Sequence, residues 1–248
     1  MIDFERGAKV TGSKFYFLTE QDALWEWQMC GFMIQHHMDV GYKLVIPPYL
    51  VNKNTATWAG LLPRFEGDYY QTTDGLMLVP TAETPLVGMH AGEIFEANQL
   101  PIKYVAFSPC FRREAGTYGK RDRGMRRVHQ FHKIELFIIC KPEESDKLHK
   151  QMIKHVMDLL DASNVRARTV ELGEDERSPV AVKTTDIEAY AKGEWLEVSS
   201  ISNTGENQSK LAQIRYRPSK GGKPHKVHLL NGSGVALPRL RIAMGVAK

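Results

Sequence analysis

The chain has 248 residues with 42% hydrophobic and 25% charged side chains, which is typical of soluble globular domains and excludes a disordered or collagen-like chain. No apolar stretch approaches the roughly 20 residues that span a bilayer, and the first residues lack the apolar core of a secretory signal. We therefore expect a cytoplasmic protein without a membrane partner, and the net charge of +4 is too small to indicate nucleic acid by itself.

The first half of the chain predicts short elements. A capping-box pattern at 19–22 predicts the start of a helix that ends near Gly41. A short strand follows at 43–46 and is stopped by two prolines. Residues 69–80 predict a hairpin with its turn at Asp74-Gly75, and Thr81 can then cap a helix that continues to about Glu93.

The second half predicts longer elements, with strands at 104–114 and 128–139 on either side of a glycine- and charge-rich loop. Pro142 suits the first turn of a helix that ends near Ala162. Further strands are predicted at 165–171, 180–189, 195–201, 210–217 and 226–231, before a last helix that starts near Pro238. Strands in runs favour an α+β fold, an antiparallel sheet flanked by helices, in a single domain over 1–248.

Known glycine-rich phosphate loops are missing from the sequence, which contains neither GxxxxGK[ST] nor GxGxxG. Any nucleotide must therefore be bound by another arrangement of residues. The three cysteines, Cys30, Cys110 and Cys140, form no CxxC pair, so reduced thiols are expected and a cysteine zinc site has no support.

Charged and aromatic residues alternate around 112–135. Side chains alternate between the faces of a strand, so Arg112 and Glu114 are expected to share one face. The returning strand should present Arg127, His129, Phe131, Lys133 and Glu135 together. Arginine suits phosphate or carboxylate, an aromatic ring suits a purine, and a carboxylate suits an amine. These parts could hold an amino acid beside ATP, although a solvated charged face is the simpler alternative.

The loop between these strands is strongly basic. Residues 117–127 contain five basic side chains and one acid, a net charge of +4 that equals the excess of the whole chain. Such a loop fits a polyphosphate or an RNA backbone, and a plain basic surface loop is the alternative.

Phe111 to Glu114 and Arg127 to Glu135 resemble motif 2 of the class II aminoacyl-tRNA synthetases, and the second segment is most similar to the seryl-tRNA synthetase family. Other matches follow in the order that the family has. They are Gly41 to Pro48 (motif 1), Pro80 to Glu83 (the TxE element), Glu197 to Asn203 (the metal and ATP segment), and Leu230 to Gly234 with Pro238-Arg239 (motif 3). The resemblance covers essentially the whole chain.

The resemblance implies activation of L-serine by ATP to seryl-adenylate, followed by transfer to tRNA(Ser). Catalysis would consist of positioning and charge stabilisation, with Arg112, Arg239 and Glu197 as the catalytic residues. Arg112 is implied to bridge the serine carboxylate and the α-phosphate, and Arg239 to hold the distal phosphates. The residues that the resemblance implies in ATP binding are Arg112, Arg113, Glu114, Arg127, Val128, Phe131, Glu197, Val198, Ser199, Ser200 and Arg239.

Adenine is expected to stack on Phe131 and to contact Glu114 and the backbone near Val128. Mg²⁺ would be held with ATP by Glu197 and Ser200. These two residues are three apart and would face opposite ways on a regular strand, so we expect a bulge near Ser199.

Serine is implied to bind Thr81, Ala82, Glu83, Arg112, Glu135, Asn231 and Ser233. Ser233 would read the substrate hydroxyl, and a site built to hydrogen-bond a hydroxyl rejects the analogue that lacks it. Two plainer alternatives stay open: Thr81 could serve only as a helix cap, and Ser233, between glycines, only as part of a turn.

Seryl-tRNA synthetases normally carry an N-terminal coiled coil that grips tRNA, and this sequence resembles the catalytic domain without it. We therefore expect a homodimer that forms seryl-adenylate and contacts the acceptor end of tRNA(Ser) weakly. The alternatives are a stand-alone paralogue that charges a carrier protein and a non-catalytic binding or dimerisation module. Zinc-dependent relatives use a cysteine near motif 3, where this chain has Asn231-Gly232-Ser233, so no zinc is expected.

Overall fold

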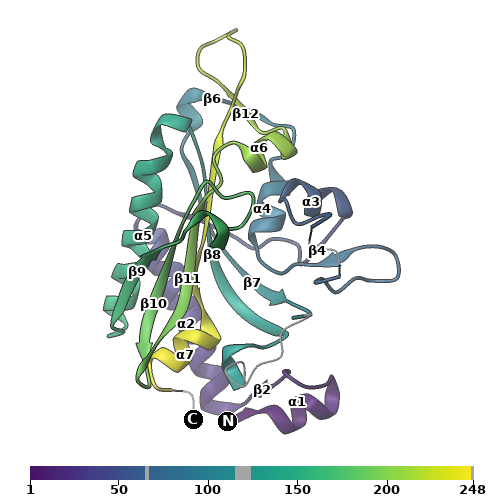
Figure 1. Ribbon diagram of the computed structural model, residues 1–248, viewed down its shortest axis with the longest axis vertical. Coiled ribbons are helices and arrows are strands. Elements are labelled where there is room, and N and C mark those ends of the chain that lie inside the picture. Colours follow the sequence, from purple (N-terminus) through teal and green to yellow (C-terminus); the bar gives the residue numbers. More distant parts are fainter. Residues whose placement is uncertain (65–66, 115–123, 247–248) are drawn as a thin grey trace.

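A seven-stranded sheet forms the centre of the computed structural model, which describes residues 1–64, 67–114 and 124–246 (Figure 1). Its strand order is β3-β7-β8-β14-β11-β10-β9. Only β3 and β7 run parallel, and the other neighbours are antiparallel. The bounds are β3 (Lys43–Val45), β7 (Ile102–Phe111), β8 (Gln130–Cys140), β14 (His228–Ala236), β11 (Glu194–Asn203), β10 (Lys183–Ala191) and β9 (Ala167–Glu171).

One face of this sheet is covered by α2 (Glu20–Asp39), α5 (Ser145–Ala162) and α7 (Leu237–Ala243). The largest hydrophobic core lies between them, and alternate residues of β8 such as Ile134, Leu136 and Ile138 contribute to it with no exposed surface. At roughly 2 kcal/mol for each fully buried aliphatic side chain, this layer supplies much of the driving force for folding.

The opposite face is covered over only part of its area. The helices α3 (Lys53–Trp58), α4 (Glu83–Met89) and α6 (Asn207–Ala212) lie over it, and Phe137 and Ile139 of β8 are buried there in a second core. Phe131, Lys133 and Glu135 belong to the same alternating face. Lys133 and Glu135 are buried, whereas Phe131, nearer the start of β8, is only half-buried and can meet a ligand.

Smaller elements complete the described chain. They are β1 (Ile2–Asp3), α1 (Phe4–Val10), β2 (Phe17–Leu18), β4 (Leu50–Val51), β5 (Met77–Leu78), β6 (Ile94–Glu96), β12 (Arg215–Arg217), β13 (His225–Lys226) and the 3-10 turns η1 (Ala97–Gln99), η2 (Gly124–Arg126), η3 (Pro142–Glu144) and η4 (Glu174–Glu176). None of the helices within the described residues is long and apolar enough to cross a bilayer.

The expected α+β fold with a largely antiparallel sheet flanked by helices is confirmed, but several local predictions are wrong. Residues 210–212 of the strand predicted at 210–217 belong to α6, and β12 pairs in a separate three-stranded sheet with β6 and β13. The capping box at 19–22 is absent, since Thr19 makes no side-chain cap bond. The predicted 69–80 hairpin is formed, because the amides of Thr72 and Leu78 donate to the carbonyls of Leu76 and Tyr70, and its second arm, β5, also pairs with β4. The helix predicted to reach Glu93 ends at Met89.

Candidate active site

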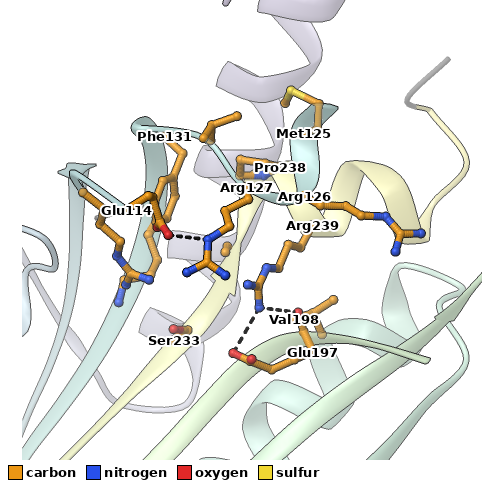
Figure 2. Close-up of a pocket in the computed structure, with 14 residues that line it drawn as sticks. Glu114, Met125, Arg126, Arg127, Phe131, Glu197, Val198, Ser233, Pro238 and Arg239 are labelled. Carbon is orange, nitrogen blue, oxygen red and sulfur yellow. Dashed lines mark hydrogen bonds and ion pairs between the residues drawn. The ribbon is translucent and has the colours of Figure 1, made fainter. Parts of the chain in front are cut away.

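Motif 2 begins where β7 ends. The amide of Arg112 donates to the carbonyl of His129 at 2.9 Å, so the two segments stay paired for one residue beyond the end of β7. Glu114 has φ +52° and has left the strand, so the expected strand face shared by Arg112 and Glu114 is not formed. Glu114 instead forms an ion pair with Arg127 across the pocket wall (Figure 2).

A solvent-open pocket lies between the ends of β7 and β8, the strand β11 and the start of α7. It is lined by Arg112, Glu114, Met125, Arg126, Arg127, Val128, Phe131, Lys133, Glu197, Val198, Ser233, Ala236, Pro238 and Arg239. The guanidinium of Arg112 lies 5.2 Å from the centre of the Phe131 ring, which keeps both groups in place at one wall. A flat aromatic ring beside several arginines matches the chemistry of a nucleotide.

Arg239 and Glu197 form the opposite wall. Pro238 stands in the first turn of α7, where its missing N–H costs nothing, and Arg239 follows it. One guanidinium nitrogen of Arg239 donates to the carbonyl of Glu197 at 2.8 Å and lies 3.1 Å from its carboxylate (Figure 2). The arginine is thus aimed across the pocket mouth, although its side chain keeps 30% of its surface exposed.

A bulge in β11 separates Glu197 from Ser200, as expected. In β10, Ile187 is paired with Ser199 and Glu188 is paired with Glu197. Val198 of β11 therefore has no partner in β10 and is the extra residue of the bulge. The hydroxyl of Ser199 donates to the carbonyl of Ser233 at 2.6 Å and does not line the pocket.

Asp186 lies beside this bulge. Burial raises the pKa of its carboxyl group, which a side-chain hydrogen bond with Ser200 and the charge of Arg239 partly oppose. Its buried Oδ1 atom has no hydrogen-bond partner. Carboxylate and hydroxyl oxygens are the ligands that Mg²⁺ prefers, so this donor set fits that ion. Among the described residues, no group of three or more His, Cys, Asp or Glu side chains is arranged to hold a metal ion.

A buried polar network continues from the pocket toward α4. Thr81 donates to Glu135 at 2.8 Å and accepts from Lys133 at 2.9 Å, and Lys133 is ion-paired with Glu135. The Thr81 hydroxyl also accepts a 3.3 Å bond from the amide of Glu83, so it supports the start of α4 as well as the network. Lys133 and Glu135 are almost fully buried, which makes this pairing costly to disturb.

Glu83 is the second carboxylate of this network. It accepts from Asn231 at 3.0 Å and from Gln208 at 2.6 Å. Burial, with the nearby negative charge of Glu135, raises the pKa of Glu83 to about 7. Lys133 already pairs with Glu135, whereas Asn231 and Gln208 are neutral partners of Glu83, so the Glu83 carboxylate can take the ammonium group of a ligand.

The remaining predicted residues lie in different places. Arg113 is exposed, and its amide bonds to the carbonyl of Asp68, while Ala82 is buried in the second core. Neither lines the pocket, so their predicted ligand contacts stay predictions. The basic residues Lys120, Arg121 and Arg123 fall outside the described part of the chain.

The sequence placed Lys133 on the charged face of the returning strand, because it alternates with Phe131 and Glu135, but gave it no role in ligand binding. Gln208 and Asp186 were missed as site residues. Gln208 had no signal in the sequence, since it reaches Glu83 only through the position of α6.

Residues 65–245 match the family described as the tRNA synthetase class II core domain (G, H, P, S and T). Curated relatives include a serine–tRNA ligase of Prosthecochloris aestuarii and one of Petrotoga mobilis, each 44% identical over 98% of this chain. The chain spans 58% of the length of each.

Solved structures give the same similarity. A seryl-tRNA synthetase from Pyrococcus horikoshii complexed with ATP is 40% identical with a TM-score of 0.94. The match covers 98% of this chain and 55% of the Pyrococcus chain. The cytoplasmic serine–tRNA ligase of Naegleria fowleri in complex with AMP is 28% identical with a TM-score of 0.92, over 98% of this chain and 58% of its own.

Proposed function

The chain belongs to the class II aminoacyl-tRNA synthetase core-domain family, and from that premise we propose that it activates L-serine with ATP. In the proposed reaction a serine carboxylate oxygen attacks the α-phosphorus, the bond to pyrophosphate breaks, and seryl-adenylate forms. No protein nucleophile is needed, so the residues act by positioning and by stabilising charge.

The arginine-rich pocket supports ATP binding. Phe131 offers a ring for adenine, and the Glu114–Arg127 pair borders the same wall. Arg112 stands between this wall and the acidic network, where a guanidinium fork can contact an α-phosphate and a carboxylate together. Arg239, at the other wall, suits the distal phosphates. Both similar solved structures hold an adenine nucleotide, one ATP and one AMP.

Serine as the substrate is supported by one observation above the others, the two-carboxylate network beside Arg112. Glu83 and Glu135 can pair with the serine ammonium, and Asn231 and Thr81 add polar groups that suit a small hydroxylated side chain. Ser233 lines the adjoining pocket and is our candidate for the hydroxyl contact. A larger amino acid would have to displace buried, hydrogen-bonded side chains.

Mg²⁺ is proposed to accompany ATP, with Glu197 and Ser200 as the protein ligands and Asp186 behind them. The ion would neutralise charge on the phosphates and on the departing pyrophosphate. Within the chain, Arg239 holds Glu197 through both its carbonyl and its carboxylate, which keeps that carboxylate oriented.

We further propose that the seryl group passes to tRNA(Ser), in a cytosolic homodimer. The three cysteines are free and buried, which suits a reducing compartment. For the dimer, β3 is an edge strand, and exposed apolar side chains occur on α2 and on or directly after β3: Leu24, Trp27, Phe32, Leu44 and Ile46. A second copy of the chain would cover both.

Titration calorimetry with a non-hydrolysable seryl-adenylate analogue tests the proposed specificity. We expect the seryl analogue to bind at least about 100-fold more tightly than the alanyl one, because a missing hydroxyl leaves polar groups unpaired. Equal affinity for the two analogues would refute the assignment to serine.

A further inference from the structure

The sheet face that carries Glu197 continues, uncovered, away from the pocket. In the register of β10 and β11, Glu188 faces Glu197 and Tyr190 faces Trp195. Alternation places these four side chains on one face. Ile187 and Ala189 point the other way, into the core beneath α5. The side chains of Tyr190 and Glu197 keep 40% and 46% of their surface exposed.

Two arginines complete this surface at the edge of the sheet, where β9 is the last strand (Figure 1): Arg168 lies in β9 and Arg166 directly precedes it. The guanidinium of Arg166 lies 5.1 Å from the ring of Tyr190 and 5.4 Å from that of Trp195. Arg168 lies 4.3 Å from Trp195 and bonds to Glu188 at 2.7 Å. Arg166 is exposed and forms no ion pair with any carboxylate in the described part of the chain. We call Arg166, Arg168, Tyr190 and Trp195 the arginine–aromatic surface.

This surface adjoins the rim of the pocket. Trp195 is two residues from Glu197, roughly 7 Å along an extended strand. Its neighbour Glu194 is ion-paired with Arg126, which lines the pocket. A polymer whose end enters the pocket past Arg239 therefore meets the arginine–aromatic surface within one or two further units.

The rings of Tyr190 and Trp195 contact each other with their centres 5.3 Å apart, and Arg166 packs on both. These contacts hold the cluster together but leave the charge of Arg166 without a carboxylate among the described residues, so it can meet an anionic ligand. Guanidinium groups recognise phosphates, and exposed aromatic rings and guanidinium planes stack on unpaired bases. The combination of both at a pocket rim is the chemistry of a single-stranded nucleic-acid contact.

We propose that the arginine–aromatic surface binds the unpaired 3′ end of the RNA whose terminal hydroxyl accepts the seryl group. Arg166 contacts a backbone phosphate, and Tyr190 stacks on a base. This proposal rests on the proposed function for the identity of the RNA, but the surface itself can be measured separately from the reaction.

Binding of a short fluorescent single-stranded RNA, followed by anisotropy from about 50 to about 300 mM salt, tests the surface. The variants are Arg166→Gln, which removes the charge, and Tyr190→Leu, which removes the ring. Lys150→Gln and Phe17→Leu are matched controls, because Lys150 is an exposed cation on α5 and Phe17 is 43% exposed on β2. Serine-dependent ATP–pyrophosphate exchange, which needs no RNA, is measured on every variant.

Arg166→Gln should weaken RNA binding about tenfold at low salt and flatten the plot of log affinity against log salt by about 0.7. Tyr190→Leu should weaken binding about tenfold with the same slope as the parent. Both should retain full exchange activity. RNA binding that is unchanged in the two variants, or weakened equally by the controls, would refute the proposal that the arginine–aromatic surface binds RNA. Absence of exchange in the parent would overturn the proposed function instead.

Discussion

In the proposed serine site, Glu83 is the residue on which we expect recognition of serine to depend most. Its carboxylate is enclosed with that of Glu135, and its pKa of about 7 means that it is half protonated at neutral pH. A serine ammonium binds the ionised form, so binding must expel the proton when the pH is low. Asn231 and Gln208 hold the carboxylate in place in either state.

The KM for serine should therefore fall as the pH rises. Below pH 7 we expect KM to increase about tenfold for each pH unit lost, and above it to level off. Glu83→Gln should remove this dependence and raise KM by about 10- to 100-fold, the loss of one charged hydrogen bond. Steady-state exchange kinetics between pH 5.5 and 8.5 would measure both.

Stability should change in the opposite direction, which separates the two effects. The pKa of Glu83 is raised in the folded protein above its ordinary value of 4.5. Its contribution to the free energy of unfolding is therefore fully present below about pH 4.5 and is lost as the pH rises through about 7. If KM fell and the free energy of unfolding rose together with rising pH, the pH dependence of KM would come from a group other than Glu83.

At the scale of elements, the helix that carries Arg239 is anchored through a buried arginine. Arg241 has no exposed surface, is ion-paired with Asp22, and donates to the Asp22 carbonyl at 2.7 Å. Its guanidinium also lies 4.2 Å from the ring of Trp25. These contacts tie α7 to α2 and so set the position from which Arg239 reaches the pocket.

Arg241→Ala should lower the free energy of unfolding by about 3–5 kcal/mol, because it leaves the buried Glu26 of α2, whose carboxylate lies 3.8 Å from the guanidinium, and the partly exposed Asp22 without this cation. Urea denaturation would measure this change, with Lys150→Ala expected to stay within about 0.5 kcal/mol of the parent. A loss below about 1 kcal/mol would show that α7 does not depend on this contact.

Elements with strong local patterns were predictable, and those decided by tertiary contacts were not. Alternation of side chains predicts the paired strands β7 and β8. Helix periodicity predicts α5, which follows the short turn η3 that begins with Pro142. The sequence at 207–212 has strand-like neighbours, yet it forms α6 because Gln208 and Ser209 are buried and bonded against other segments. Thr19 precedes α2 without capping it, since its hydroxyl bonds to the carbonyl of Met1.

At the scale of the whole molecule, the site joins distant segments. Glu83 and Asn231 are 148 positions apart and Glu83 and Gln208 are 125 apart, so their meeting depends on the complete fold. Resemblance to a family predicted Glu83 and Asn231, whereas spacing alone could predict only the alternating run around Phe131. Gln208 and Asp186 needed the structure.

Self-association should depend on the exposed apolar side chains near β3 and on α2. Ile46 and Trp27 keep 70% and 73% of their surface exposed, and a charge at either would be desolvated in a dimer. Ile46→Glu and Trp27→Glu should each weaken the dimer by at least about tenfold in analytical ultracentrifugation. Val182→Glu, at another exposed apolar position, should not. A parent chain that sediments as a monomer at high concentration would contradict this interface.

Serine-dependent ATP–pyrophosphate exchange is the most direct measurement of amino-acid activation by this chain. We predict exchange with serine but not with alanine, threonine or glycine. Arg112→Ala should lower it by at least about 100-fold without loss of thermal stability, and Arg217→Ala should leave it unchanged. No exchange by a folded chain that binds ATP, exchange driven by another amino acid, or full activity without Arg112 would contradict the proposed activation of serine.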